Sequence, residues 1–310
     1  RTGPWLSAGR FESCTKHGRR SGPLDAHTGL MCRLFGINAG DKQVHVDYWL
    51  VDAPDSILVE SHRNPDGTGV GWFADGDTPH VDKQARSAFT DSAFTKEAKS
   101  VDARTLITHI RAATAGHDAL ENTHPFVFDG RIMAHNGGFG DLPAVEAQLG
   151  DYLGQVHGQT DSERYAALIA KKTAEHGGDV SAGIIAAAGW LADNVPMYSL
   201  NCLVAAPGHL WALRYPDQRA LHIARRRVDP ATGLVASSAL AGHTVKAAQA
   251  TEVVIIASER IDEQEDWRML DPGELIHVGP DLSFTSTLAI ERPPAHLHLL
   301  DEADPNVDTF

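Results

Sequence analysis

Hydrophobic residues in this chain are gathered into short runs, separated by turns rich in Gly, Pro, Asn and Asp. Continuous apolar runs of about four to eight residues between turn signals are typical of buried β-strands. The pattern predicts strands over residues 33–38, 70–73, 104–111, 131–135, 200–205, 210–214, 221–228 and 252–257. Only a short loop separates the strands at 200–205 and 210–214, which favours a hairpin.

The first helix is predicted just ahead of a cluster of turn residues. Asp52 is a suitable N-cap and Pro54 suits a first helical turn, so this helix would run to about His62. Residues 63–69 (Arg-Asn-Pro-Asp-Gly-Thr-Gly) predict a tight turn through which the backbone can approach a site. Their glycines match neither a P-loop nor the three-glycine dinucleotide pattern, so we assign this segment no phosphate-binding role.

Two more helices are predicted near the middle of the chain. Thr160 and Glu163 have capping-box spacing, which predicts a helix that ends near Gly177. An Ala-rich helix follows over residues 181–193. Before them, the strand at 131–135 is expected to stop in residues 136–140, Asn-Gly-Gly-Phe-Gly. Strands in both halves and two central helices indicate sheets covered by helices within one domain.

The composition excludes several classes of protein. The chain has 310 residues, 42% hydrophobic and 22% charged, which is enough for one large domain with a real core. Its formal charge of −14 would repel a phosphate backbone, so no nucleic-acid partner is expected. No apolar run approaches the roughly 18–20 residues of a membrane span. Its 17 histidines lack the spacing of metal ligands, so neither a metal nor another cofactor is expected.

The cysteines and the two ends of the chain suggest where the domain lies. Three cysteines build no disulfide framework, which favours a reducing cytoplasm. Residues 1–31, with five basic and two acidic residues, have no apolar periodicity and are expected to be a non-native or removable extension. This extension has three interpretations: an upstream translation artefact, a propeptide and an Arg-rich transit peptide. We favour the first, with Met31 as the true start. Residues 292–310 are expected to form a flexible acidic tail.

Cys32 follows Met31 at the head of the first predicted strand. Removal of an initiator Met would leave a thiol and a free α-amine on this one residue. An α-amine titrates near pH 7.7–8.0, so it can accept the thiol proton and act as the base for its own nucleophile. A small apolar residue that starts a buried strand is the alternative interpretation of a lone Cys.

Five motifs decide between these interpretations. They are Met31-Cys32, His109-Ile110-Arg111-Ala112-Ala113-Thr114, Asn122-Thr123-His124-Pro125-Phe126, His135-Asn136-Gly137 and Thr160-Asp161-Ser162-Glu163. In this order they resemble the class II glutamine amidotransferases, which are N-terminal nucleophile (Ntn) hydrolases, and within them the stand-alone sub-group without a synthase domain. The resemblance implies an α+β fold, a four-layer αββα sandwich of two antiparallel sheets covered by helices. Residues 32–291 would form this glutamine amidotransferase type-2 domain.

The resemblance also implies the catalytic roles. Cys32 would attack the side-chain amide of glutamine, or a related γ-glutamyl amide, and form a thioester that water hydrolyses to glutamate. Asn136, through its side-chain amide, and Gly137, through its backbone N–H, match the family's donors to the oxyanion.

Four residues match positions that bind or enclose the substrate. Arg111 would bind the α-carboxylate through its planar guanidinium, and Asp161 would pair with the α-ammonium. Thr114 would lie in a loop that closes over the substrate. His124 matches a family position near the pocket, although a lone His before Pro is more often structural. The expected ligand is therefore a small molecule, glutamine or a γ-glutamyl compound.

One departure keeps the exact function open. Ala112 stands where members fused to synthases often have Trp, which puts ammonia channelling within this polypeptide in doubt. The protein would then be a glutaminase that serves a separate synthase subunit, or a γ-glutamyl hydrolase in a biosynthetic pathway. If the N-terminal extension stays attached, the acylated nitrogen of Cys32 is no base, and a catalytically silent glutamine-binding or sensing module is the alternative. A homodimer is open as well.

Overall fold

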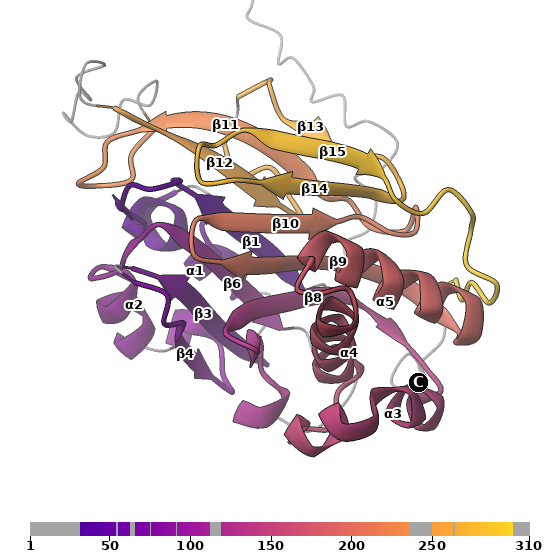
Figure 1. Cartoon of the computed structure of the whole chain (residues 1–310). Coiled ribbons are helices and arrows are strands. Elements are labelled where there is room, and N and C mark those ends of the chain that lie inside the picture. Colours follow the sequence, from indigo (N-terminus) through magenta and orange to yellow (C-terminus); the bar gives the residue numbers. More distant parts are fainter. Residues whose placement is uncertain are drawn as a thin grey trace, which may run out of the picture.

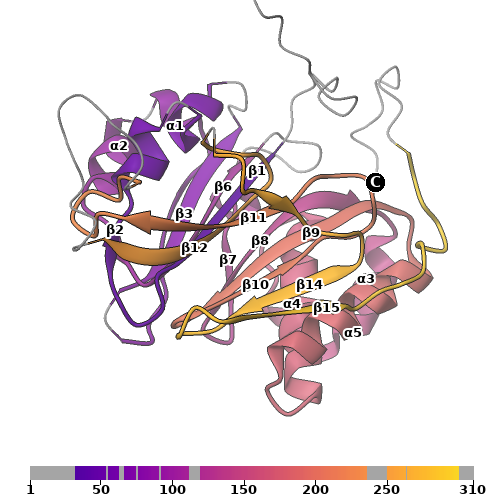
Figure 2. The ribbon, with the colours of Figure 1, turned by 90° about the horizontal axis from the view of Figure 1, so that it is seen from above.

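The computed structural model describes residues 32–53, 55–62, 66–74, 76–90, 92–111, 119–235, 250–262 and 264–299. Two antiparallel sheets stack face to face, and helices cover the outer side of each sheet (Figure 1). Figure 2 looks down on the four layers, from α1 and α2 through the two sheets to α4 and α5. The predicted four-layer α+β sandwich is confirmed.

The first sheet has seven strands in the order β13-β11-β12-β1-β6-β3-β4. They are β1 (Arg33–Asn38), β3 (Gly67–Phe73), β4 (His80–Gln84), β6 (Thr105–Arg111), β11 (His222–Val228), β12 (Thr251–Ala257) and β13 (Arg268–Met269). Beside it lie the π-helix η1 (Tyr48–Asp52), α1 (Ile57–Glu60), the 3₁₀-helix η2 (Ala88–Thr90), α2 (Ser92–Ala98) and the ribbon of β2 (Val44–His45) and β5 (Asp102–Ala103). A buried apolar cluster joins these helical segments to the sheet.

The second sheet has six strands in the order β15-β14-β10-β9-β8-β7. They are β7 (Phe126–Phe128), β8 (Arg131–Phe139), β9 (Met197–Ala206), β10 (His209–Leu213), β14 (Glu274–Val278) and β15 (Phe284–Leu288). Its outer face packs against α3 (Leu142–Leu149), α4 (Asp161–Glu175) and α5 (Val180–Asn194). The 3₁₀-helices η3 (Leu120–Asn122) and η4 (Gly150–Gln155) lie in the connections.

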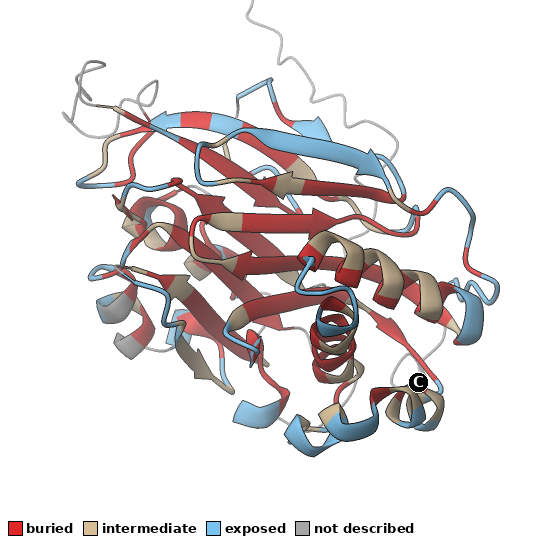
Figure 3. Cartoon of the chain, viewed as in Figure 1, coloured by how far each residue is buried: buried red, intermediate tan, exposed pale blue. Residues whose placement is uncertain are grey.

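A third buried cluster fills the space between the sheets. Leu34 and Ile107 of the first sheet meet Ile132, Leu203 and Ile276 of the second. Figure 3 shows the central strands buried, whereas β15 at the sheet edge is exposed. Strands that are buried on both faces need apolar residues at consecutive positions, which is why the sequence shows runs rather than alternation. None of the described helices has both the length and the apolar composition needed to cross a membrane.

Most predicted elements are confirmed. β1, β6, β11 and β12 lie within a residue of the predicted strands, and β9 and β10 form the predicted hairpin. α4 starts at Asp161, and the Thr160 hydroxyl accepts the N–H of Glu163 at 3.3 Å as an N-cap. The Ala-rich helix is α5.

The first helix starts later in the chain than predicted, so the predicted start is wrong. Ala53 donates its N–H to the carbonyl of Tyr48 at 2.7 Å and is itself extended, so the π-helix closes there. α1 begins only at Ile57, and its N-cap is Ser56, whose hydroxyl accepts the N–H of Val59 at 3.3 Å. Asp52 therefore ends η1 instead of capping a helix. Pro54 lies outside the described residues.

The glycines at 67–69 form the start of β3, where a turn was predicted. A Cβ on Gly69 would lie 2.0 Å from the carbonyl oxygen of His124, and one on Gly67 would lie 3.1 Å from the Thr123 side chain. Glycine at these positions lets the segment that contains Thr123 and His124 lie directly against the strand. Residues 63–65 are outside the described part of the chain.

The predicted stop of the strand at residue 135 is also wrong, because β8 continues to Phe139. Asn136 pairs with Asn201 of β9, and Gly137 pairs with Leu200. A Cβ on Gly137 would lie 1.9 Å from the carbonyl oxygen of Ser199. The glycine is therefore required by the close approach of β9 rather than by a turn.

The beginning of the expected flexible tail is hydrogen-bonded to the domain. Arg292 forms an ion pair with Asp193 of α5 at 2.6 Å. Ala295 donates its N–H to Ala192 at 2.7 Å, and Met197 of β9 donates to the carbonyl of His296 at 3.0 Å. Residues 1–31 and 300–310 lie outside the described residues.

Candidate active site

Cys32 lies at the head of β1, next to the centre of the first sheet. Arg33 of β1 pairs with Ile110 of β6, so Cys32 directly precedes this pair on one strand and Arg111 directly follows it on the other. Cys32 is partly exposed, whereas Arg111 is buried. The antiparallel register therefore brings together two of the residues singled out in the sequence.

Asn136 reaches Cys32 from the second sheet. Its side-chain amide donates a hydrogen bond to the backbone carbonyl of Cys32 at 2.9 Å. The backbone of Asn136 is fixed in turn, since the hydroxyl of Ser199 donates to its carbonyl at 3.1 Å. Both sheets thus contribute to the surroundings of the cysteine.

The N–H of Gly137 points away from β9. Leu200, its partner across the ladder, donates its own N–H to the carbonyl of Tyr215 at 2.7 Å, so the two form a non-hydrogen-bonded pair. The neighbour on the other side, β7, pairs with β8 only as far as Met133. Gly137 is partly exposed, and its N–H is directed to the same side as that of Phe139, two residues further along β8.

Asp161, the first residue of α4, lies on that side of β8. Its carboxylate accepts the N–H of Phe139 at 3.1 Å. Desolvation by the surrounding protein raises the pKa of Asp161, and the nearby His135 and the bound N–H of Phe139 oppose this shift. The helix dipole places partial positive charge at the N-terminus of α4, which favours this partly exposed carboxylate.

His135 of β8 forms hydrogen bonds with both β9 and α4, next to Asp161. Its Nε2 donates to the carbonyl of Ser199 at 3.1 Å, which requires a proton on that nitrogen. Its Nδ1 lies 2.9 Å from the hydroxyl of Ser162 on α4. Burial lowers the pKa of His135, so the ring is neutral and accepts the Ser162 hydroxyl.

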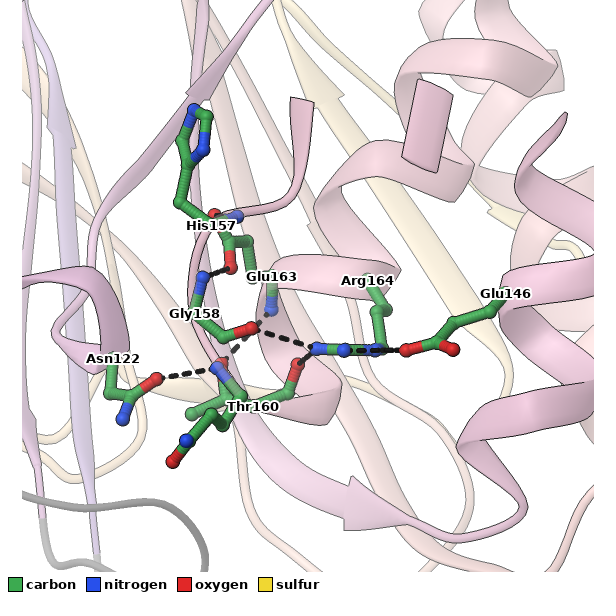
Figure 4. A network of polar contacts seen from close by, with 8 residues as sticks. Asn122, Glu146, His157, Gly158, Thr160, Glu163 and Arg164 are labelled. Atoms are coloured by element: carbon green, nitrogen blue, oxygen red, sulfur yellow. Dashed lines mark hydrogen bonds and ion pairs between the residues drawn. The ribbon is translucent and has the colours of Figure 1, made fainter. Parts of the chain in front are cut away.

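A polar network fixes the entry to α4 (Figure 4). The carboxylate of Glu163 accepts the N–H groups of His157 at 3.0 Å and Gly158 at 2.6 Å. In a full capping box this carboxylate would bond the N–H of Thr160, so only one half of the predicted box is present.

Two more side chains in Figure 4 tie this segment to its neighbours. Arg164 binds Glu146 of α3 at 2.5 Å and donates to the carbonyl of Thr160 at 3.0 Å. Asn122, from the motif that contains His124, accepts the N–H of Gln159 at 2.7 Å. Because the preceding loop and α3 are both bound, the position of Asp161 is fixed by its surroundings.

His124 and His109 form a buried pair behind Arg111. Their ring centroids are 4.0 Å apart. Burial lowers the pKa of His109 to about 3, and the neighbouring His135 and Arg111 contribute. Burial lowers the pKa of His124 as well, and repulsion from a protonated His109 would lower it further. Both rings are therefore neutral near pH 7. Thr114, within 112–118, lies outside the described residues.

Tyr198 is a neighbour of Cys32 that the sequence analysis did not single out. The β8–β9 register shifts between Gly138 and Phe139, from Gly138 opposite Ser199 to Phe139 opposite Met197, which leaves Tyr198 as the extra residue of a bulge. Burial and the nearby Cys32 raise the pKa of its phenol. One feature of the sequence could have drawn attention to this segment, because Ser199 and Asn201 are polar residues within an otherwise apolar strand.

The fold is a four-layer sandwich with a cysteine at the head of a central strand, and sequence comparison gives the family. The family model "Glutamine amidotransferases class-II" matches residues 31–294. The chain belongs to the class-II glutamine amidotransferases. An uncharacterized protein of Methanocaldococcus jannaschii is 29% identical over 266 residues, which cover 79% of this chain and 68% of that protein.

Two solved structures share the fold at low sequence identity. Glutamine phosphoribosylpyrophosphate amidotransferase of B. subtilis matches with a TM-score of 0.57 and 19% identity, over 84% of this chain and 50% of that one. The glutamine aminotransferase class-II domain protein of Silicibacter pomeroyi matches with a TM-score of 0.55 and 20% identity, over 83% and 98%. The present chain thus spans about half the length of the B. subtilis enzyme.

Proposed function

We propose that Cys32 is the nucleophile of an amidohydrolase that cleaves the side-chain amide of glutamine, or of a γ-glutamyl compound, through a thioester. The observation that carries this proposal is the hydrogen bond from the Asn136 amide to the carbonyl of Cys32. It joins the two motif residues to which a nucleophile and an oxyanion donor are assigned, although they are 104 positions apart.

In the first step, Sγ of Cys32 bonds to the amide carbon, and the α-amine of Cys32 takes the thiol proton. The C–N bond then breaks, and the same amine returns the proton to the departing ammonia or amine. Water attacks the thioester in the second step, which releases glutamate and restores the thiol. The proposal requires a chain that begins at Cys32, because an acylated nitrogen does not accept a proton.

The oxyanion of each tetrahedral intermediate is stabilised by two donors. A side-chain amide has two N–H bonds. One bond of Asn136 is used on the Cys32 carbonyl, and we assign the other to the oxyanion. The second donor is the N–H of Gly137, which points away from β9. A preplaced donor of this kind lowers the activation barrier by about 3–4 kcal/mol.

The charged ends of the substrate are assigned to two residues. Arg111 binds the α-carboxylate, and Asp161 binds the α-ammonium, which reverses the cost of holding its carboxylate away from water. Thr114 closes over the bound substrate. His124 acts indirectly, because its ring packs against His109 and Phe126 behind Arg111. A nucleophilic thiol must stay reduced, so we also propose a cytoplasmic location.

The test uses a chain that begins at Met31, with Cys32 exposed by removal of the methionine. Intact mass would verify the new N-terminus, and a glutamine-like diazoketone should then add one equivalent to Cys32. Cys202 is the internal control, because burial raises its thiol pKa to about 12. Cys32→Ala should abolish hydrolysis of glutamine and of γ-glutamyl amides. Full activity in this variant would refute the proposal.

A further inference from the structure

We propose that a second copy of this chain binds at β15, the open edge of the second sheet. Two β15 strands would pair antiparallel about a two-fold axis at Ser286, and the two six-stranded sheets would join into one continuous sheet. This inference is independent of the proposed function of Cys32, because it concerns a different part of the molecule.

The outer edge of β15 has no partner strand among the described residues. All five residues of β15 are exposed, and Figure 3 shows the strand exposed along its length. Natural sheets protect such an edge with charged side chains, proline or a bulge, because its unpaired backbone groups can bind another strand. Residues 284–288 (Phe-Thr-Ser-Thr-Leu) contain no charge and no proline, and their register with β14 is regular. The edge is therefore open to the addition of a strand.

The backbone groups at this edge belong to alternate residues of β15. Ala289 donates its N–H to the carbonyl of Gly273 at 2.8 Å, at one end of the β14–β15 ladder. In an antiparallel ladder this orientation repeats at every second residue, so the odd-numbered positions of β15 face β14. The N–H and carbonyl groups of Phe284, Ser286 and Leu288 are consequently directed to the open edge.

The order of residue types in β15 is the same in both directions. An apolar residue, Phe284 or Leu288, stands at each end, a threonine stands inside each of them, and Ser286 is at the centre. The backbone groups directed to the open edge are centred on Ser286 as well. A two-fold axis at Ser286 would therefore let each of these N–H groups donate to the other copy. This self-complementarity favours a second copy of the chain over an unrelated partner.

The same pairing brings matching side chains together. Phe284, which is 38% exposed, would lie opposite Leu288 of the second copy, which is 52% exposed, and both would leave water. On the other face of the strand, Thr285 would lie opposite Thr287 of the second copy. Threonine pairs are favourable across antiparallel strands. The small side chain of Ser286 lets the two backbones approach at the axis.

The edge strand and its flanks are uncharged. Residues 282–290 contain no charged residue, although the chain has a formal charge of −14. Arg225, beside this edge, forms an ion pair with Glu252. Arg268 forms another with Glu274 of β14 at 2.9 Å. The dimer should become tighter as the ionic strength rises, because salt screens the repulsion between two acidic copies.

Sedimentation equilibrium of the full chain at about 1–200 µM measures the association, since an interface of this small size is expected to be weak. We expect the mass to rise from monomer to dimer over this range. Ser286→Pro should raise the dissociation constant of the dimer by about 30-fold or more, because it removes one N–H donor from each copy. The sheet itself should tolerate the proline, since β14 does not use the N–H of Ser286.

Ser286→Ala is the matched control. It loses the hydrogen bond from the serine hydroxyl to Glu274 at 2.5 Å and keeps the N–H, so it should dimerise like the unmodified protein. Hydrogen exchange supplies a second measurement that needs no variant. The amides of Phe284, Ser286 and Leu288 should become more protected as the protein concentration rises. If Ser286→Pro does not fold, this measurement decides.

A monomer at every concentration would overturn the inference. So would a dimer that a folded Ser286→Pro variant leaves unchanged, because the two copies would then meet at another face. Protection of the three amides that does not depend on concentration would also refute it, since a segment of the same chain would then cover the edge. Labelling of Cys32 by the diazoketone is a separate result and bears only on the proposed function.

Discussion

Asn136 donates its side-chain amide to the backbone carbonyl of Cys32 at 2.9 Å, across the space between the two sheets. One side chain of the second sheet thereby fixes the head of β1 in the first. Any catalytic geometry at Cys32 depends on the packing of both sheets, because neither sheet holds this contact alone. Substitutions at Asn136, Asp161 and Gly137 separate the chemistry of this site from the packing that positions it.

Asn136→Ala should lower kcat by about 10²–10³, because it removes the proposed oxyanion donor and the hydrogen bond to the Cys32 carbonyl. KM should change little, since the charged ends of the substrate bind elsewhere. Steady-state kinetics with glutamine or a γ-glutamyl amide measure both constants. Asn194→Ala, an exposed position at the end of α5, is the control and should leave kcat unchanged. An active Asn136→Ala variant would show that the amide has no catalytic role.

Asp161→Asn should raise KM by about 10- to 100-fold with a smaller effect on kcat, because the charge proposed to pair with the α-ammonium is lost. The amide oxygen still accepts the N–H of Phe139, so the fold is kept. Asp179→Asn provides the comparison, since Asp179 caps α5 through the N–H of Ala182, at the opposite end of the hairpin of helices. Its KM should not change. Equal effects of the two substitutions on KM would contradict the assigned role of Asp161.

Gly137→Ala should destabilise the fold by at least about 2 kcal/mol, because its Cβ would lie 1.9 Å from the carbonyl oxygen of Ser199 and β9 would have to move. Urea unfolding, followed by fluorescence, measures the change. Gly154→Ala is the matched control, since nothing lies within 4 Å of its Cβ. That substitution should be neutral or slightly stabilising. A Gly137→Ala variant as stable as the control would refute the close approach of the two strands.

The free energy of unfolding should fall as the pH drops from 6.5 towards 3. The pKa of His109 is about 3 in the folded state and 6.5 when unfolded, so in this range the unfolded chain binds the proton first. Stability is therefore complete above pH 6.5, and His109 alone removes about 1.4 kcal/mol per pH unit below it. The buried His124 acts in the same direction. Asp161, whose pKa is raised, acts in the opposite direction.

Urea titrations at several pH values, on the protein and on His109→Gln, isolate this contribution. The difference in the free energy of unfolding between the two should shrink or change sign as the pH falls, because Gln carries no proton. A difference that is constant between pH 7 and pH 4 would mean that the His109 ring has the same pKa in the folded and the unfolded protein. The opposing contribution of Asp161 is common to both proteins and cancels.

The sequence by itself determined the elements that depend on local signals. Continuous apolar runs are found where strands are buried on both faces, as in β1 and β12, and burial is the property that such runs report. Thr160 fixed the start of α4, because a side-chain cap acts within three residues. The order of the motifs indicated the family, and the match over residues 31–294 confirms it. The site residues assigned from those motifs stay predictions.

Only the tertiary structure decided the features that depend on a distant partner. Asn136 and Gly137 resemble a turn in isolation, yet β9 pairs with both and continues the strand. The glycines at 67 and 69 likewise serve the approach of Thr123 and His124, which are more than fifty positions away. The bulge at Tyr198 arises from a register shift between β8 and β9, and register is a property of the pair of strands. A glycine or a polar residue within an apolar strand indicates that another segment packs closely there. Only the tertiary structure determines which segment it is.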